Sequence, residues 1–128
     1  MVLVDTNVII DYWNNPTDFY TDIFKKETIA ICGPVQAELI HGAVSIRDIN
    51  RINRAISCFK MLQYESEWNE LGKMLYTLRM SGYTLPFTDV MIAQICMKNN
   101  ASILTKDKHF LKIKDCFPDL MMYDIEEE

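Results

Sequence analysis

The sequence VLVDTNVIIDYW at residues 2–13 places one acidic residue between a strand pattern and a helix pattern. Residues 2–4 form an uninterrupted apolar run, as in a short strand buried on both faces of a sheet. Residues 8–13 are apolar enough for a helix that packs under a sheet, and the NNP sequence at residues 14–16 is a stop signal for that helix. Asp5 therefore lies where the strand ends and the helix is about to begin.

Strand-like and helix-like segments alternate along the rest of the chain. Further strands are predicted at residues 28–32, 61–64, 102–105 and 120–123. Helices are predicted at residues 17–26, 34–43, 46–59, 66–80 and 86–97, with a short helix from residue 107. Strands separated by helices favour a parallel sheet with helices on both faces. The predicted fold class is therefore α/β, with three α/β/α layers around a short, mainly parallel central sheet.

Two of these helices carry apolar stripes that predict a buried face. Ser66 is a candidate cap for the helix that follows it. The stripe expected to face the core in that helix is Trp68, Leu71, Leu75 and Leu78. In the preceding helix the marked face is Ile46, Ile49, Ile52, Ile56 and Phe59.

Size and composition indicate one globular unit. With 128 residues, of which 49% are apolar, we expect residues 1–128 to form a single domain with a proper core. No segment approaches the roughly 20 apolar residues of a membrane span, and no signal-peptide pattern is visible. We therefore expect a soluble, cytoplasmic protein without a membrane partner. The four cysteines form no C-x-x-C pair, which argues against a zinc knuckle or a thioredoxin-like site.

The net charge of −5 at first argues against a nucleic-acid partner. However, four of the negative charges belong to the C-terminal tail, at Asp124 and residues 126–128. The rest of the chain is nearly neutral, and it is mildly basic apart from the four candidate site acids described next. This distribution is compatible with a phosphodiester substrate and bound cations.

Four acids fall near the boundaries of the predicted elements. Asp5 and Asp107 each follow a strand pattern, and Glu38 and Asp89 lie near the starts of helix patterns. In a parallel α/β sheet the loops at the carboxyl ends of the strands form the usual site crevice, and helix starts commonly face the same edge. We therefore expect the four acids to gather at one end of the molecule.

Carboxylates gathered in one pocket repel each other. Two unit charges about 4 Å apart cost roughly 1 kcal/mol in water and roughly 4 kcal/mol at an effective dielectric constant of about 20. A hard divalent cation removes this conflict, and Mg²⁺ or Mn²⁺ fits a site of carboxylates and water without a His/Cys cluster. Such an ion can activate water and offset charge on a transferring phosphate. The four acids therefore indicate a Mg²⁺ or Mn²⁺ site.

Four stretches together resemble the PIN-domain ribonucleases, especially the compact toxins of VapBC toxin–antitoxin pairs. They are VLVDTNVIIDYW at 2–13, VQAELIHGA at 35–43, PFTDVMIAQI at 86–95 and ILTKDKHF at 103–110. Each stretch alone is weak, because an acid after an apolar run is common. Their order and spacing span nearly the whole chain, which makes the combination fairly specific.

The resemblance implies a Mg²⁺- or Mn²⁺-dependent endoribonuclease that acts as the toxin of a type II toxin–antitoxin system. Asp5 and Asp89 resemble the principal metal ligands, and Glu38 and Asp107 resemble the acids that complete the catalytic cluster. Cleavage of RNA is expected to leave 3′-hydroxyl and 5′-phosphate ends. The family also implies a homodimer and a cognate antitoxin protein that blocks the acidic pocket.

Other polar residues near these motifs have weaker interpretations. Thr6 and Thr105 are candidates for hydrogen bonds to a ligand carboxylate or to water on the metal. Gln94 stands where the family often has a small residue, and His109 stands where it often has an acid. His41 and His109 are more simply read as hydrogen-bonded or exposed histidines than as catalytic bases, because two histidines so far apart make no metal motif.

Basic residues at helical spacing offer a possible contact surface for RNA phosphates. Arg47, Arg51 and Arg54 recur at intervals of four and three residues along one predicted helix face. An ordinary solvated helix face is the favoured interpretation.

Two alternative functions differ in what the acids do. In a phosphohydrolase of the haloacid dehalogenase type, the aspartate after the first strand is a nucleophile, with a second Asp two residues later and a Thr two beyond that. Here those positions hold Asn7 and Ile9, which argues against this alternative. The other alternative is a catalytically weak PIN-like module that binds RNA or a protein partner. The presence of all four acids argues against it.

Overall fold

The computed structural model describes residues 1–65 and 67–124. Ser66, expected to cap a helix, and the acidic residues of the C-terminal tail beyond residue 124 lie outside this described part. The elements are β1 (Val2–Val4), α1 (Thr6–Asn14), α2 (Asp18–Lys26), β2 (Ile29–Cys32), α3 (Gly33–His41), α4 (Ile46–Ile56), β3 (Lys60–Leu62), α5 (Trp68–Met80), α6 (Phe87–Lys98), β4 (Ser102–Leu104), α7 (His109–Cys116) and β5 (Met121–Met122).

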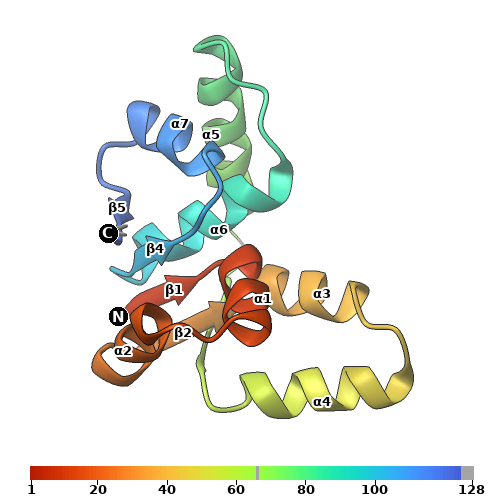
Figure 1. Ribbon diagram of the computed structural model, residues 1–128. Coiled ribbons are helices and arrows are strands. Elements are labelled where there is room, and N and C mark those ends of the chain that lie inside the picture. The colour runs from red at the N-terminus through yellow and green to blue at the C-terminus, as the bar shows by residue number, and fades with distance from the viewer. Residues whose placement is uncertain (66, 125–128) are drawn as a thin grey trace.

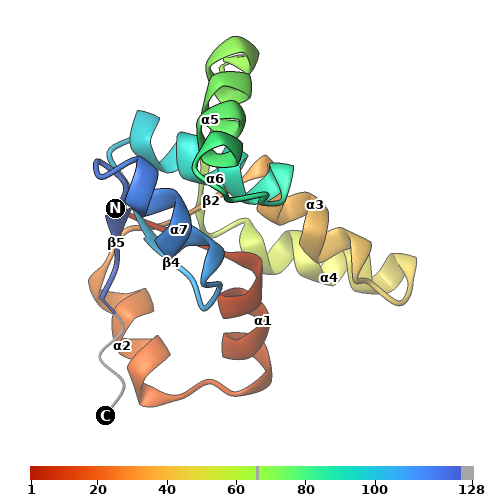
Figure 2. The same cartoon turned by 90° about the horizontal axis from the view of Figure 1, so that it is seen from above.

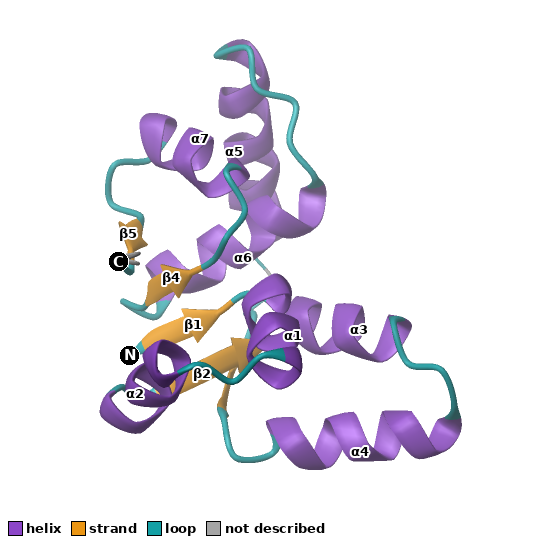
Figure 3. Ribbon diagram, in the orientation of Figure 1, coloured by secondary structure: helices purple, strands orange, loops and turns teal. Residues whose placement is uncertain are grey.

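The five strands form a parallel sheet in the order β3-β2-β1-β4-β5 (Figures 1 and 3). β1 lies at the centre, where Val2 pairs with Ile29 of β2 on one side and with Ser102 of β4 on the other. All residues of β1 and β2 are buried. This explains their uninterrupted apolar sequences, because a central parallel strand is covered on both faces. The predicted parallel sheet is confirmed.

Helices cover both faces of the sheet, as the alternating pattern predicted. Seen from above, α1 and α2 lie on one face and α6 lies on the other (Figure 2). The buried side chains between these layers form one apolar cluster, which includes the fully buried Phe110 and Leu104. Among the described residues, no helix has both the length and the apolar composition needed to cross a membrane.

Local sequence signals set most helix boundaries. Asp5 caps α1 and the hydroxyl of Thr17 caps α2, where it accepts a hydrogen bond from the backbone N–H of Tyr20. Pro34 lies in the first turn of α3, where its missing N–H costs nothing. Gly82 follows α5 with a φ of 91°, a left-handed conformation that glycine adopts without strain.

Two apolar residues predicted to face the core do not do so. Trp68 is 55% exposed, because it begins α5 and packs against the ring of Tyr64, with the ring centroids 4.9 Å apart. Leu71 and Leu78 of the same stripe are buried as expected. Ile46 is 74% exposed because α3 and α4 form a hairpin that projects beyond the sheet (Figure 1).

Candidate metal centre

The sheet order defines a topological switch point at one edge, and the space outside the strand ends at this point is called the crevice below. The chain winds outward from β1 through β2 to β3, then crosses to β4 on the other side of β1. The point where the winding reverses lies between β1 and β4, and ligands of open α/β sheets bind outside the carboxyl ends of the strands at such a point. Asp5 directly follows β1, and Asp107 lies in the loop after β4. The fold therefore brings these two acids to one edge, as predicted.

Asp5 is a buried carboxylate held from two sides. Its backbone N–H donates to the carbonyl of Leu104 at 2.9 Å, which ties the end of β1 to β4. Its Oδ1 accepts from the backbone N–H of Thr6 at 2.8 Å, and its Oδ2 accepts from the hydroxyl of Thr105 at 2.7 Å. Burial raises the pKa of Asp5, and the repulsion from Asp107 adds to the rise, whereas these two hydrogen bonds oppose it.

Thr105 connects the carboxylate of Asp5 to the loop that carries Asp107. Its hydroxyl donates to Asp5 and accepts from the backbone N–H of Asp107 at 3.0 Å. Thr105 is buried, so its bond to Asp5 is shielded from water, and the bond from Asp107 is partly shielded. The predicted bond from Thr105 to a carboxylate is present, and its partner is the site acid Asp5 itself.

Replacement of this hydroxyl by a methyl group should be costly. In Thr105→Val, the N–H of Asp107 loses its partner and Asp5 loses one donor. We expect unfolding to become easier by about 1–3 kcal/mol, the usual cost of unsatisfied buried polar groups. Urea unfolding at neutral pH measures this change. Thr105→Ser keeps the hydroxyl and should recover most of the stability; equal losses in both variants would contradict the assigned role.

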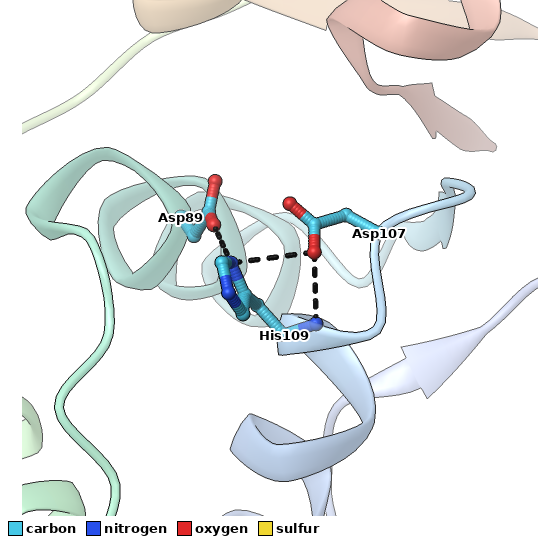
Figure 4. Close-up of side chains that lie close together, drawn as sticks. All are labelled: Asp89, Asp107 and His109. Carbon is cyan, nitrogen blue, oxygen red and sulfur yellow. Dashed lines mark hydrogen bonds and ion pairs between the residues drawn. The ribbon is translucent and has the colours of Figure 1, made fainter.

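Asp89, Asp107 and His109 form the tightest group in the site (Figure 4). Nδ1 of His109 lies 2.8 Å from Oδ2 of Asp89 and 3.3 Å from Oδ1 of Asp107. Asp107 Oδ1 also accepts from the backbone N–H of His109 at 2.9 Å. One ligand atom from each of the three side chains lies within 4.8 Å of the others. Two carboxylates and an imidazole thus converge on one small volume.

The carboxylate of Asp89 is partly shielded from solvent and lies among other acids. It belongs to the first turn of α6, and its side chain faces His109 (Figure 4). Burial raises the pKa of Asp89, and the nearby Asp107 and Asp5 add to this rise, whereas the bond from His109 lowers it. The raised pKa of Asp89 indicates that this carboxylate lacks enough positive charge nearby, and a bound cation would supply it.

Glu38 is exposed on α3, and the charges of the other three acids act on it. It is the sixth residue of α3, so it lies in the second turn of the helix rather than at its very start. Partial burial raises the pKa of Glu38, and repulsion from Asp5, Asp89 and Asp107 raises it further. All four predicted acids are therefore close enough for their charges to repel one another. Asp5 and Glu38 are nevertheless not members of the compact group around His109.

The remaining candidates contribute less directly. The hydroxyl oxygen of Thr6 is buried and has no hydrogen-bond partner within residues 1–65 and 67–124. His41 is exposed at the C-terminal end of α3. Arg51 forms an exposed ion pair with Asp48, which agrees with the interpretation of the arginine stripe as a solvated helix face. Gln94 is buried, and its amide N–H donates to the carbonyl of Glu67.

His109 is the site residue that sequence reasoning underestimated. Its contact with Asp89 joins positions twenty residues apart. Neither helical nor strand periodicity relates these two positions. From the sequence, a metal motif was considered only between His41 and His109, and His109 was not paired with an acid. The available signal was the spacing of two residues from Asp107, which puts His109 at the start of α7, beside the loop that carries this acid.

Comparison with known proteins identifies the family. The family model described as PIN domain matches residues 2–115, and the chain belongs to the PIN domain family. Its fold is similar to that of a chain in VapBC-1 from nontypeable Haemophilus influenzae, with a TM-score of 0.81 and 25% identity over 97% of this chain and 98% of that one. Among curated proteins, no match was found.

Two further solved structures share this fold. One is VapBC2 from Rickettsia felis bound to a promoter DNA fragment, with a TM-score of 0.79 and 21% identity over 98% of this chain and all of that one. The other is DNA-bound VapBC from Salmonella typhimurium, with a TM-score of 0.80 and 22% identity over 96% of each chain. The resemblance drawn from the sequence and the predicted fold class are confirmed.

Proposed function

We propose that this protein is a divalent-cation-dependent endoribonuclease and the toxin of a toxin–antitoxin pair. The observation that carries the proposal is the convergence of Asp5, Glu38, Asp89 and Asp107 on the crevice between β1 and β4, with the pKa values of Asp5, Glu38 and Asp89 raised by burial and mutual repulsion. Carboxylates that resist ionisation in this way are stabilised in their ionised form by a bound cation. The cation can in turn bind a phosphodiester. Membership of the PIN domain family supports this reading.

The donor atoms fit Mg²⁺ or Mn²⁺. Ligand atoms that share one such ion, each about 2.1 Å from it, lie at most about 4.2 Å apart. One carboxylate oxygen of Asp89 and one of Asp107 already lie within 4.8 Å of each other, so small side-chain rotations bring them into range. Asp5 and Glu38 complete the negative charge of the site. A bound cation would supply positive charge that lowers the pKa of water and offsets charge developing on the phosphate.

The protein's own groups hold this arrangement in place. Thr105 and the N–H of Thr6 fix the carboxylate of Asp5, and Thr105 also fixes the backbone of Asp107. Lys106, between these two loop residues, forms an ion pair with Asp11 of α1. The loop after β4 is therefore tied to Asp5 and to α1, which keeps the acids near one another before any ion or RNA binds.

An antitoxin partner is supported by the VapBC names of the structural neighbours. A groove of about 530 Å³ runs between α1, α3 and α4, and Ile10, Trp13 and Leu39 line it together with Glu38. Ile10 and Trp13 are 45% and 38% exposed. A protein segment with apolar side chains would bury these residues and cover the acid beside them, which is how we propose the inhibitor acts. A homodimer stays a prediction from the family.

The direct test is cleavage of a 5′-labelled RNA by the purified, antitoxin-free protein. We expect cleavage with Mg²⁺ or Mn²⁺, none with EDTA, and recovery when the ion is added back in excess. The products should carry 3′-hydroxyl and 5′-phosphate ends. RNA binding without metal-dependent cleavage would support the binding-module alternative instead. Trapping of a phosphate on Asp5 would support the phosphohydrolase.

A further inference from the structure

We propose that His109 is itself a ligand of the divalent cation, and that it makes the centre prefer transition-metal ions such as Mn²⁺ to Mg²⁺. The inference rests on the metal centre of the proposed function and adds to it a ligand and a metal preference. The sequence predicted a site of oxygen ligands only, for which Mg²⁺ would serve well. The structure places a nitrogen atom in the middle of that site.

The position of the imidazole carries the inference. One atom, Nδ1, faces both Oδ2 of Asp89 at 2.8 Å and Oδ1 of Asp107 at 3.3 Å (Figure 4). Because Nδ1 lies beside both carboxylates, a cation bound between Asp89 and Asp107 would also be within reach of this nitrogen. On binding, Nδ1 would exchange its hydrogen bond to Asp89 for a bond to the ion, and both carboxylates would keep their positions beside it.

His109 is also held at the site while remaining accessible. Its backbone N–H is bonded to Asp107, and the next residue, Phe110, is fully buried in the core. The backbone of His109 therefore has little freedom to leave the crevice. Its side chain is 37% exposed, so an ion from solvent reaches the ring without rearrangement of the core.

The chemistry of the donor atom sets the metal preference. Mg²⁺ is a hard ion that favours oxygen ligands and retains its waters, whereas imidazole nitrogen binds first-row transition metals better. One nitrogen among carboxylate ligands therefore strengthens the binding of Mn²⁺ more than that of Mg²⁺. Removal of this nitrogen should therefore reduce the difference between the affinities for Mn²⁺ and for Mg²⁺.

The competing role for His109 is to orient Asp89 through a hydrogen bond without touching the ion. Two substitutions separate these roles. In His109→Asn, the side-chain amide retains an N–H donor near the place of Nδ1 but is a poor metal ligand. In His109→Asp, the nitrogen is replaced by a carboxylate oxygen that suits Mg²⁺. His41→Asn is the matched control, because His41 is the other histidine of this chain and lies exposed at the end of α3.

The experiment is metal binding to the full chain, without RNA. Calorimetry gives the dissociation constants for Mn²⁺ and Mg²⁺, and pulsed electron paramagnetic resonance of bound Mn²⁺ detects a coordinated nitrogen. We expect a nitrogen coupling in the wild type and in His41→Asn, and its loss in both His109 variants. The preference for Mn²⁺ over Mg²⁺ should fall by about tenfold in His109→Asn and further in His109→Asp.

The outcomes distinguish this inference from the proposed function. If the wild type binds both ions but shows no nitrogen coupling, and the ion preference is the same in His109→Asn, His109 is not a ligand and the inference is wrong while the metal centre stands. If the wild type binds neither ion, the metal centre and the inference are both wrong.

Discussion

Asp89→Asn and Asp5→Asn should each slow metal-dependent RNA cleavage by at least about a hundredfold, a loss of about 2.7 kcal/mol of transition-state stabilisation. Each substitution removes one negative charge and one strong oxygen ligand from the crevice, so the affinity for a divalent cation falls and less charge is offset during cleavage. Single-turnover cleavage of a labelled RNA under saturating protein measures the effect without interference from product release.

The fold should survive both substitutions. Asparagine is as good a helix cap as aspartate, so the side-chain oxygen of Asn at position 5 can still accept from the N–H of Thr6 and begin α1, while its amide N–H faces the hydroxyl of Thr105, which can accept from it. Asp22→Asn, which changes an exposed acid on α2 away from the crevice, is the matched control and should cleave at the wild-type rate. Wild-type cleavage by a folded Asp5→Asn or Asp89→Asn protein would remove that acid from the catalytic assignment.

Divalent cations should stabilise the folded protein, and the effect should grow as the pH rises. The pKa values of Asp5, Glu38 and Asp89 are raised in the folded state, chiefly by burial. An acid with a raised folded pKa favours folding while it is protonated, and this contribution is lost as the pH rises through the folded pKa. Without a cation, the protein should therefore lose stability from mildly acidic to neutral pH.

A bound cation reverses this trend because it binds the ionised carboxylates. With free ion at about 100 times its dissociation constant, the free energy of unfolding should rise by about 2.7 kcal/mol. Urea unfolding with EDTA and with Mn²⁺, at a series of pH values, measures both effects. Asp5→Asn should unfold less readily than the wild type in EDTA at neutral pH and should gain less from Mn²⁺. A cation effect that is equal at all pH values in this range would contradict the proposed ionisation.

Local sequence signals were enough to predict the sheet and the edge at which the acids gather. The apolar run before Asp5 and the one before Asp107 define two parallel strands, and acids that lie just beyond the carboxyl ends of such strands share an edge, whatever the positions of the helices. The helix boundaries at Thr17, Pro34 and Gly82 are likewise local, because capping and backbone conformation depend on only a few neighbouring residues.

The parts that sequence reasoning missed depend on contacts between distant segments. The pairing of His109 with Asp89 depends on how the N-terminal ends of α6 and α7 approach each other, which neither helix encodes alone. Trp68 has the spacing of a core residue, but it lies at the first position of α5 and packs on Tyr64 instead. Periodicity describes one helix at a time and does not reveal which of its residues lie beyond the edge of the core.

The hydrogen bond from Thr105 to Asp5 joins residues 100 positions apart in the chain. During synthesis, β1 emerges from the ribosome long before β4, its neighbour in the sheet, has been translated. Throughout that time the first acid has neither its hydroxyl donor nor the loop that carries Asp107. For the nuclease proposed here, we therefore expect a growing chain to cut no RNA, and activity to arise only after the last quarter of the protein has been made and has folded against the first strand.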